Sequence, residues 1–223
     1  MSRIVVVAPH PDDETLGCGG TLLRHKAEGD EIHWLIMTMI TEASGFSKER
    51  VEARQKEISN VVNAYEFSSV YQARFIAKEL DLVPKKDLID EVSSAFNKIK
   101  PDTIYLPYRG DIHSDHKAVH DAVTASVKPF RYPFIRRVLA YETLSETEFG
   151  VRAEISGFKP NLWINITDQI DKKIKIMKMY EGEMGEHPFP RSERSIRALA
   201  IVRGARCGQQ SAEAFMILQE VNE

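Results

Sequence analysis

The chain has 223 residues, of which 43% are hydrophobic, and its formal net charge is −3. This length and apolar content suffice for one cored domain without disulfides, so we expect a single domain over residues 1–223. The small negative charge excludes a global electrostatic attraction to nucleic acid. Two cysteines, Cys18 and Cys207, are too few for a disulfide scaffold or a cysteine-rich zinc site.

Apolar, β-branched runs alternate with stretches of helical period along most of the chain. The strand candidates are residues 3–8, 31–39, 69–75, 102–107, 135–142 and 161–166. The helical stretches are residues 15–28, 48–65, 85–100, 114–127, 168–184 and 192–204. This alternation predicts an α/β, Rossmann-like fold: a mainly parallel sheet with helices on both faces and an active site at the carboxyl ends of the strands.

The N-terminal stretch MSRIVVVAPH contains one arginine and an apolar run too short for a signal-peptide core. No apolar stretch approaches the roughly 20 residues that a membrane-spanning helix needs. We therefore expect an unprocessed cytoplasmic protein without a membrane span, and the sequence is compatible with a homo-oligomer.

The stretch APHPDDE, residues 8–14, places one imidazole and three carboxylates directly after the first strand. Prolines on both sides of His10 present its side chain from a stiff, extended turn. Asp12 and Asp13 fall at the start of the next helix, where negative charge is favoured, but a helix cap uses only one carboxylate. A divalent metal explains the rest. We expect His10 and Asp13 to be two of the three protein ligands of a catalytic zinc, with Asp12 free to take a proton from water.

A second polar group, DIHSDH, follows the fourth strand candidate, so it should reach the same edge of the sheet. His113 and His116 lie one helical turn apart, and Asp115 between them can orient a ring by accepting its N–H. We expect the third metal ligand here. The alternative is that Ser114 or Asp111 caps the helix while both histidines face solvent.

Three glycines in LGCGG, namely Gly17, Gly19 and Gly20, weakly resemble a dinucleotide-binding turn. The acids before them occupy the place of a pyrophosphate, so close packing of the first helix on the sheet is the preferred interpretation. Two alternatives to an enzyme stay open at this point: a non-catalytic nucleotide-binding protein and a non-catalytic metal-binding protein.

The combination of PHPDDE near the N-terminus with DIHSDH halfway along the chain resembles the LmbE-like, or PIG-L-type, family of zinc-dependent N-deacetylases. Further stretches extend the resemblance over nearly the whole chain: RQKEISNVVNAYEF, PNLWINITDQIDKKIKIMKMYEGEM, PFPRS and RGARCGQQSAEAF. The resemblance implies a hydrolase that removes the acetyl group from an N-acetylated amino sugar of the N-acetylglucosamine type. The implied substrate is a small molecule in which the amino sugar is either free or linked to a nucleotide or a lipid.

Individual roles also follow from the resemblance. It implies that His10, Asp13 and His116 hold Zn²⁺, and two imidazoles with one carboxylate also accommodate Fe²⁺. It implies that Asp12 is the general base. The remaining two residues, His113 and Asp115, match the imidazole that stabilises the oxyanion and the carboxylate that would favour its charged form.

Arginines are the candidate substrate-binding residues. The resemblance implies that Arg54 contacts the sugar or a phosphate. Arg191 and Arg194 lie in GEHPFPRSERS, which we interpret as a loop that covers the substrate; the alternative is a solvated charged face. Near the C-terminus, Glu213 is interpreted as an ordinary carboxylate of a helix or loop.

Overall fold

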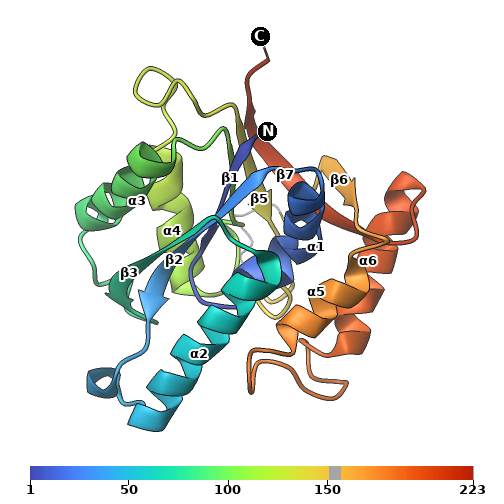
Figure 1. Ribbon diagram of the computed structural model, residues 1–223, viewed down its shortest axis with the longest axis horizontal. Coiled ribbons are helices and arrows are strands. Elements are labelled where there is room, and N and C mark those ends of the chain that lie inside the picture. Colours follow the sequence, from blue (N-terminus) through green and yellow to red (C-terminus); the bar gives the residue numbers. More distant parts are fainter. Residues whose placement is uncertain (151–156, 223) are drawn as a thin grey trace.

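The computed structural model describes residues 1–150 and 157–222. Its strands are β1 Arg3–Ala8, β2 Glu31–Met39, β3 Ser69–Ile76, β4 Thr103–Pro107, β5 Arg137–Tyr141, β6 Leu162–Asn165 and β7 Ala212–Glu220. They form one sheet in the order β3-β2-β1-β4-β5-β7-β6 (Figure 1). Strands β1 to β5 pair in parallel, whereas β7 runs antiparallel between β5 and β6. The predicted mainly parallel sheet is confirmed.

Helices cover both faces of this sheet (Figure 1). They are α1 Asp13–Ala27, α2 Lys48–Tyr65, α3 Lys85–Ile99, α4 Ser114–Ala125, α5 Ile170–Met177 and α6 Glu193–Cys207, with a short 3-10 turn, η1, at Glu42–Ser44. Helices α1, α2, α5 and α6 pack on one face, and α3 and α4 pack on the other. No helix in the described part of the chain has the length and apolar content that crossing a membrane requires.

Strand β1 is apolar at successive positions because both of its faces are buried. Ile4, Val6 and Ala8 enter the core beneath α1, α2, α5 and α6. Val5 and Val7 enter the core beneath α3 and α4. Since successive side chains of a strand point to opposite faces, a strand covered on both sides must be apolar at every position.

The strand order reverses between β1 and β4. From β1 the chain proceeds outward through β2 and β3, and from β4 it proceeds the other way to β5. The loops that leave the carboxyl ends of β1 and β4 therefore diverge and leave a crevice, as at the switch points of other open α/β sheets. Both polar motifs of the sequence begin at this crevice.

The C-terminal part of the chain differs most from the sequence predictions. Strand β7 was not predicted, and the helix expected over residues 168–184 ends at Met177. The interpretation of Glu213 as an ordinary helix or loop carboxylate was wrong. It lies in β7, is 5% exposed, and forms a 2.7 Å ion pair with Lys173.

Glu213 caps part of helix α1, although the two are far apart in the sequence. The helix contains a kink at Cys18, whose φ and ψ of −142° and 22° are not helical. After the kink, the N–H groups of Gly20 and Thr21 donate to the two carboxylate oxygens of Glu213, at 2.9 and 2.7 Å. A carboxylate therefore caps the second part of α1 as an N-cap side chain would, although it lies almost two hundred residues away in the sequence.

Close approach explains the glycines of α1, as expected. A Cβ added to Gly17 would lie 2.6 Å from Cγ of Tyr141, and one added to Gly20 would lie 2.7 Å from Cγ2 of Ile166. Tyr141 is fully buried and its hydroxyl donates to the carbonyl of Val7 at 2.9 Å, so its ring has little freedom to move. These glycines serve helix-to-sheet packing.

We predict that Gly17→Ala lowers the free energy of unfolding by about 1–3 kcal/mol, because the added methyl overpacks the contact with the Tyr141 ring. Urea unfolding followed by circular dichroism measures this. Gly157→Ala is the control: apart from its chain neighbours, no described residue has an atom within 4 Å of the added Cβ, so its effect should stay within about 0.5 kcal/mol. Equal stability of the two variants would contradict the packing argument.

Candidate metal centre and active site

The two polar motifs meet at the crevice between β1 and β4. His10, Asp12 and Asp13 lie between β1 and the first turn of α1. His113 and His116 lie at the start of α4, just after β4. Asp12, Asp13 and His116 are only 4%, 3% and 1% exposed. Polar groups from two loops are thus buried together, although about one hundred residues separate them in the sequence.

Asp13 is at the centre of the cluster. Its Oδ2 lies 3.4 Å from Nδ1 of His10 and 3.3 Å from Nε2 of His116. The same oxygen accepts the backbone N–H of His10 at 2.9 Å. One atom from each of the three side chains lies within 4.8 Å of the others, which is close enough for the three to share an ion.

The other nitrogen of each ring contacts a carboxylate. His10 Nε2 lies 2.9 Å from Oδ2 of Asp115, and His116 Nδ1 lies 2.8 Å from Oδ2 of Asp111. If these nitrogens carry the ring protons, the nitrogens that face Asp13 have free lone pairs. Carboxylates orient metal-binding histidines in this way in many zinc proteins.

These contacts fit a divalent cation. An imidazole lone pair and a carboxylate oxygen 3.3 Å apart repel each other unless a proton or cation lies between them. Nε2 of His116 is buried and has no hydrogen-bond partner among the described residues. Hydrogen bonds to Asp115 and Asp13 outweigh the effect of burial and raise the pKa of His10 to about 9. Imidazole and carboxylate groups are ordinary zinc ligands, so the donor set suits Zn²⁺.

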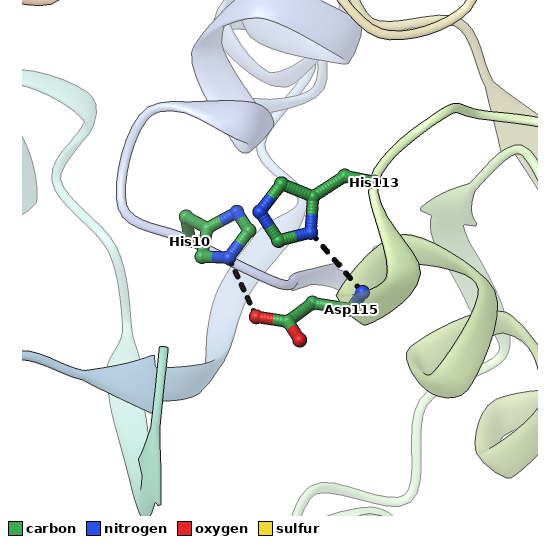
Figure 2. Close-up of side chains that lie close together, drawn as sticks. All are labelled: His10, His113 and Asp115. Atoms are coloured by element: carbon green, nitrogen blue, oxygen red, sulfur yellow. Dashed lines mark hydrogen bonds and ion pairs between the residues drawn. The ribbon is translucent and has the colours of Figure 1, made fainter. Parts of the chain in front are cut away.

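A second set of three groups, His10, His113 and Asp115, also lies close enough to hold an ion (Figure 2). In this set, however, the donor atoms are already used. The backbone N–H groups of Lys78 and Leu80 donate to Asp115 at 2.7 and 3.1 Å, in addition to its contact with His10. The hydrogen bonding therefore favours the set that contains Asp13 and His116.

His113 differs from the expectation that Asp115 holds it in a charged form. Its Nδ1 accepts the backbone N–H of Asp115 at 3.1 Å, whereas the carboxylate of Asp115 contacts His10 (Figure 2). Burial, with the nearby charge of His10, lowers the pKa of His113 to about 4. In the neutral ring Nε2 carries the proton, so His113 can still donate a hydrogen bond.

Asp12 has an unusual backbone and a buried carboxylate. Its φ of 137° and ψ of −28° are rarely adopted by residues with a side chain, and strain of this kind costs about 1–3 kcal/mol. Burial and the neighbouring charges of Asp13 and Glu183 raise the pKa of its carboxyl group. Nη1 of Arg191 lies 3.1 Å from Oδ2 of Asp12 and opposes this rise. A carboxyl with a raised pKa is suited to proton transfer near neutral pH.

A cavity of about 360 Å³ opens beside these groups. It is lined by His10, Pro11, Asp12, Asp13, Thr38, Met39, Ile40, Phe46, Arg50, Arg54, Gln72, Ala77, Lys78, His113, Thr143, Glu146, Glu183 and Arg191. Side chains from both polar motifs therefore line the cavity together with several cationic side chains. Its volume is that of a small-molecule site.

The structure places both predicted substrate-binding arginines in this lining, but each is paired within the protein. Arg54 forms an ion pair with Glu183 and lies 3.2 Å from Oε2 of Glu57. Arg191 lies 3.3 Å from Oε2 of Glu183. The third arginine, Arg194, is in the first turn of α6, exposed and away from the cavity. Of the segment between α5 and α6, Glu183 and Arg191 line the cavity.

Two carboxylates of the site, Asp111 and Glu183, were not predicted from the sequence as site residues. Asp111 was considered only as a helix cap, although it contacts His116 and also accepts the hydroxyl of Thr147 at 2.6 Å. Glu183 was not singled out. The sequence gives no local pattern that would identify it, because its partners Arg54 and Arg191 belong to different segments of the chain.

Comparison with known proteins agrees with this site. Residues 5–127, more than half of the chain, match the PIG-L family, described as GlcNAc-PI de-N-acetylase. The fold, the two polar motifs and the family match thus define the class: an α/β protein with a cluster of histidines and aspartates at the switch point of its sheet. The chain belongs to the PIG-L family.

Individual relatives cover nearly the whole chain. Diacetylchitobiose deacetylase from Thermococcus kodakarensis is 26% identical over 229 residues, which span 96% of this chain and 82% of that protein. A conserved protein from Thermus thermophilus superposes with a TM-score of 0.79 at 26% identity, covering 100% and 97% of the two chains. A 4-carboxy-2-hydroxymuconate hydratase from Pseudomonas putida has a TM-score of 0.75 at 17% identity, covering 100% and 99%. Since the likeness to this hydratase shows the fold alone, the reaction must be argued from the site.

We predict that His116→Ala loses stoichiometric Zn²⁺, because it removes one of three ligands, whereas the neighbouring His113→Ala retains it. Elemental analysis of protein dialysed against a known concentration of free Zn²⁺ measures the difference. The reverse result, with metal lost only in His113→Ala, would assign the ion to the set that contains His113 and Asp115.

Proposed function

We propose that the protein is a metal-dependent hydrolase that removes the acetyl group from an N-acetylglucosamine-type sugar or its conjugate. The observation that carries this proposal is the position of Asp13, whose Oδ2 lies within 3.4 Å of ring nitrogens from both motifs. The carboxylate of Asp12 lies beside them in the same cavity. The family description and the deacetylase relative support the acetylated amino sugar as substrate.

In this proposal His10, Asp13 and His116 hold Zn²⁺ or Fe²⁺, and Asp115 and Asp111 orient the two rings. A divalent ion in such a site acts as a Lewis acid and makes water a stronger nucleophile near neutral pH. In the neutral form of each ring, the carboxylate holds the proton on the nitrogen that faces it, so the other nitrogen offers its lone pair to the ion.

Asp12 is assigned the proton transfers. Arg191 holds Oδ2, so we assign Oδ1 as the atom that takes the proton of the attacking water. The same carboxyl group then donates this proton to the leaving amine, so that acetate and a free amine are formed. Its raised pKa makes the carboxylate a stronger base for the first transfer, and a pKa nearer the working pH lets the same group act as base and then as acid.

The residues around the reacting amide have supporting roles in this proposal. Neutral His113 donates from Nε2 to the oxyanion that forms on the former carbonyl, and the loss of such a donor typically costs about 10²–10³ in rate. Arg191 and Glu183 form one wall of the cavity. The family description and the curated relative differ in the group that carries the N-acetylglucosamine, so the proposal is limited to that sugar.

We predict that the Zn²⁺-loaded protein releases acetate from at least one member of a panel of N-acetylglucosamine, diacetylchitobiose, N-acetylglucosamine glycosides and their nucleotide or lipid conjugates. Asp12→Asn should lower kcat by about 10²–10⁴, because the amide cannot accept the water proton. Acetate is measured by a coupled assay, and the metal content of each variant is measured in parallel.

The control is Asp171→Asn. Asp171 is an exposed carboxylate on α5, 72% exposed at its side chain, and this variant should keep the activity of the parent. Absence of acetate release from every substrate at saturating Zn²⁺ would contradict the proposed function. Full activity of Asp12→Asn would contradict the role of Asp12.

A further inference from the structure

The peptide unit between Pro11 and Asp12 is held from both sides by charged side chains. Nη1 of Arg54 donates to the carbonyl oxygen of Pro11 at 2.9 Å. The N–H of Asp12 donates to Oε2 of Glu14 at 3.0 Å. Since a peptide unit is planar, two hydrogen bonds at its opposite edges fix the orientation of the whole plane.

This orientation determines the backbone of Asp12. Its φ of 137° requires the preceding peptide to be rotated into a position that residues with a side chain rarely adopt. The following peptide is already fixed, because the carbonyl of Asp12 accepts the N–H of Leu16 at 2.9 Å as the first bond of α1. The plane before Asp12 is therefore the one that could rotate. Because φ sets the direction of Cβ relative to the preceding residues, the position of the Asp12 carboxylate relative to His10 depends on this plane.

Glu14 is itself held rigidly. Its side chain is fully buried, and its Oε1 accepts the hydroxyls of Thr15 at 2.5 Å and Tyr180 at 2.6 Å. The guanidinium group of Arg54 lies over the ring of Tyr180, 5.7 Å from its centre. Tyr180, which follows α5, thus contacts both of the side chains that hold the Pro11–Asp12 peptide.

We propose that Glu14 is a positioning residue, which holds the Pro11–Asp12 peptide so that the carboxylate of Asp12 faces the reacting atoms. This inference rests on the proposed function, in which Asp12 transfers the protons. It also gives Arg54 a task other than substrate binding: its guanidinium holds the opposite edge of the same peptide. Glu14 does not line the cavity, and its hydrogen bond to the N–H of Asp12 connects it to the proposed proton-transfer group.

The variant Glu14→Gln tests this directly. A glutamine carries no charge, so its hydrogen bond to the N–H of Asp12 is weaker than that of the carboxylate. Its NH2 group cannot accept the protons that Thr15 and Tyr180 now donate to Oε1, so both hydroxyls lose this acceptor and the side chain is held less firmly. We expect kcat to fall by about 10–100-fold, because a small misplacement of a reacting group costs this much. KM and the Zn²⁺ content should stay within about twofold of the parent, since ground-state binding is unaffected.

Glu213→Gln is the matched control. Glu213 is also a buried carboxylate that accepts backbone N–H groups of α1, but it does so at Gly20 and Thr21, beyond the kink. Both variants should have a lower Tm, whereas only Glu14→Gln should have a lower kcat per metal-loaded protein. A purely structural role for Glu14 would make the two variants behave alike.

A double-mutant cycle separates an effect through Asp12 from an independent one. In the Asp12→Asn background, Glu14→Gln should cause no further loss of the residual rate, because the group that it positions no longer transfers protons. Multiplicative losses, or a parental kcat in the Glu14→Gln single variant, would overturn the inference.

Amide exchange measured by NMR provides a readout that needs no substrate. The N–H of Asp12 should be protected in the parent and should exchange at least tenfold faster in Glu14→Gln. Unchanged exchange would overturn the inference. If the parent releases no acetate from any substrate while the exchange result is as expected, the proposed function fails and the hydrogen-bond clamp stands.

Discussion

A single oxygen atom, Oδ2 of Asp13, connects the two halves of the candidate site. It lies next to imidazoles from the loop after β1 and from the start of α4, and it accepts the backbone N–H of His10. Burial of so many ionisable groups disfavours folding unless their charges are compensated. A divalent cation among Asp13, His10 and His116 would supply this compensation. The acidic crowding of the first motif is therefore understandable only together with the second motif.

Residues 157–222 contribute no side chain to the candidate metal sites, yet they fix the geometry of the first motif. Glu213 caps the second part of α1 and is neutralised by Lys173. The hydroxyl of Tyr180 holds Glu14, and Arg191 reaches the carboxylate of Asp12. An antiparallel strand and a covering segment thus support a helix whose first turn carries the chemistry.

Local patterns were sufficient for most of the fold. The buried strands β1 and β4 are recognisable as short apolar runs, and α3 by its helical period, because each pattern follows from the covering of an element by its neighbours. Strand β7 was missed because AEAFMILQE follows a glycine-containing turn and mixes charged with apolar residues. Its place between β5 and β6 depends on pairing with distant segments, which no local pattern encodes.

By itself, the sequence determined the α/β class and the chemistry of the two motifs, because element periodicity and ligand type are properties of short stretches. The tertiary structure alone decided which carboxylate orients which ring: Asp115 contacts His10, and Asp111 contacts His116. It also decided the strained backbone of Asp12 and its hydrogen bonds through Arg54 and Glu14. Such pairings depend on how the loops after β1 and β4 meet, and that meeting is set by strand order and helix packing rather than by neighbouring residues.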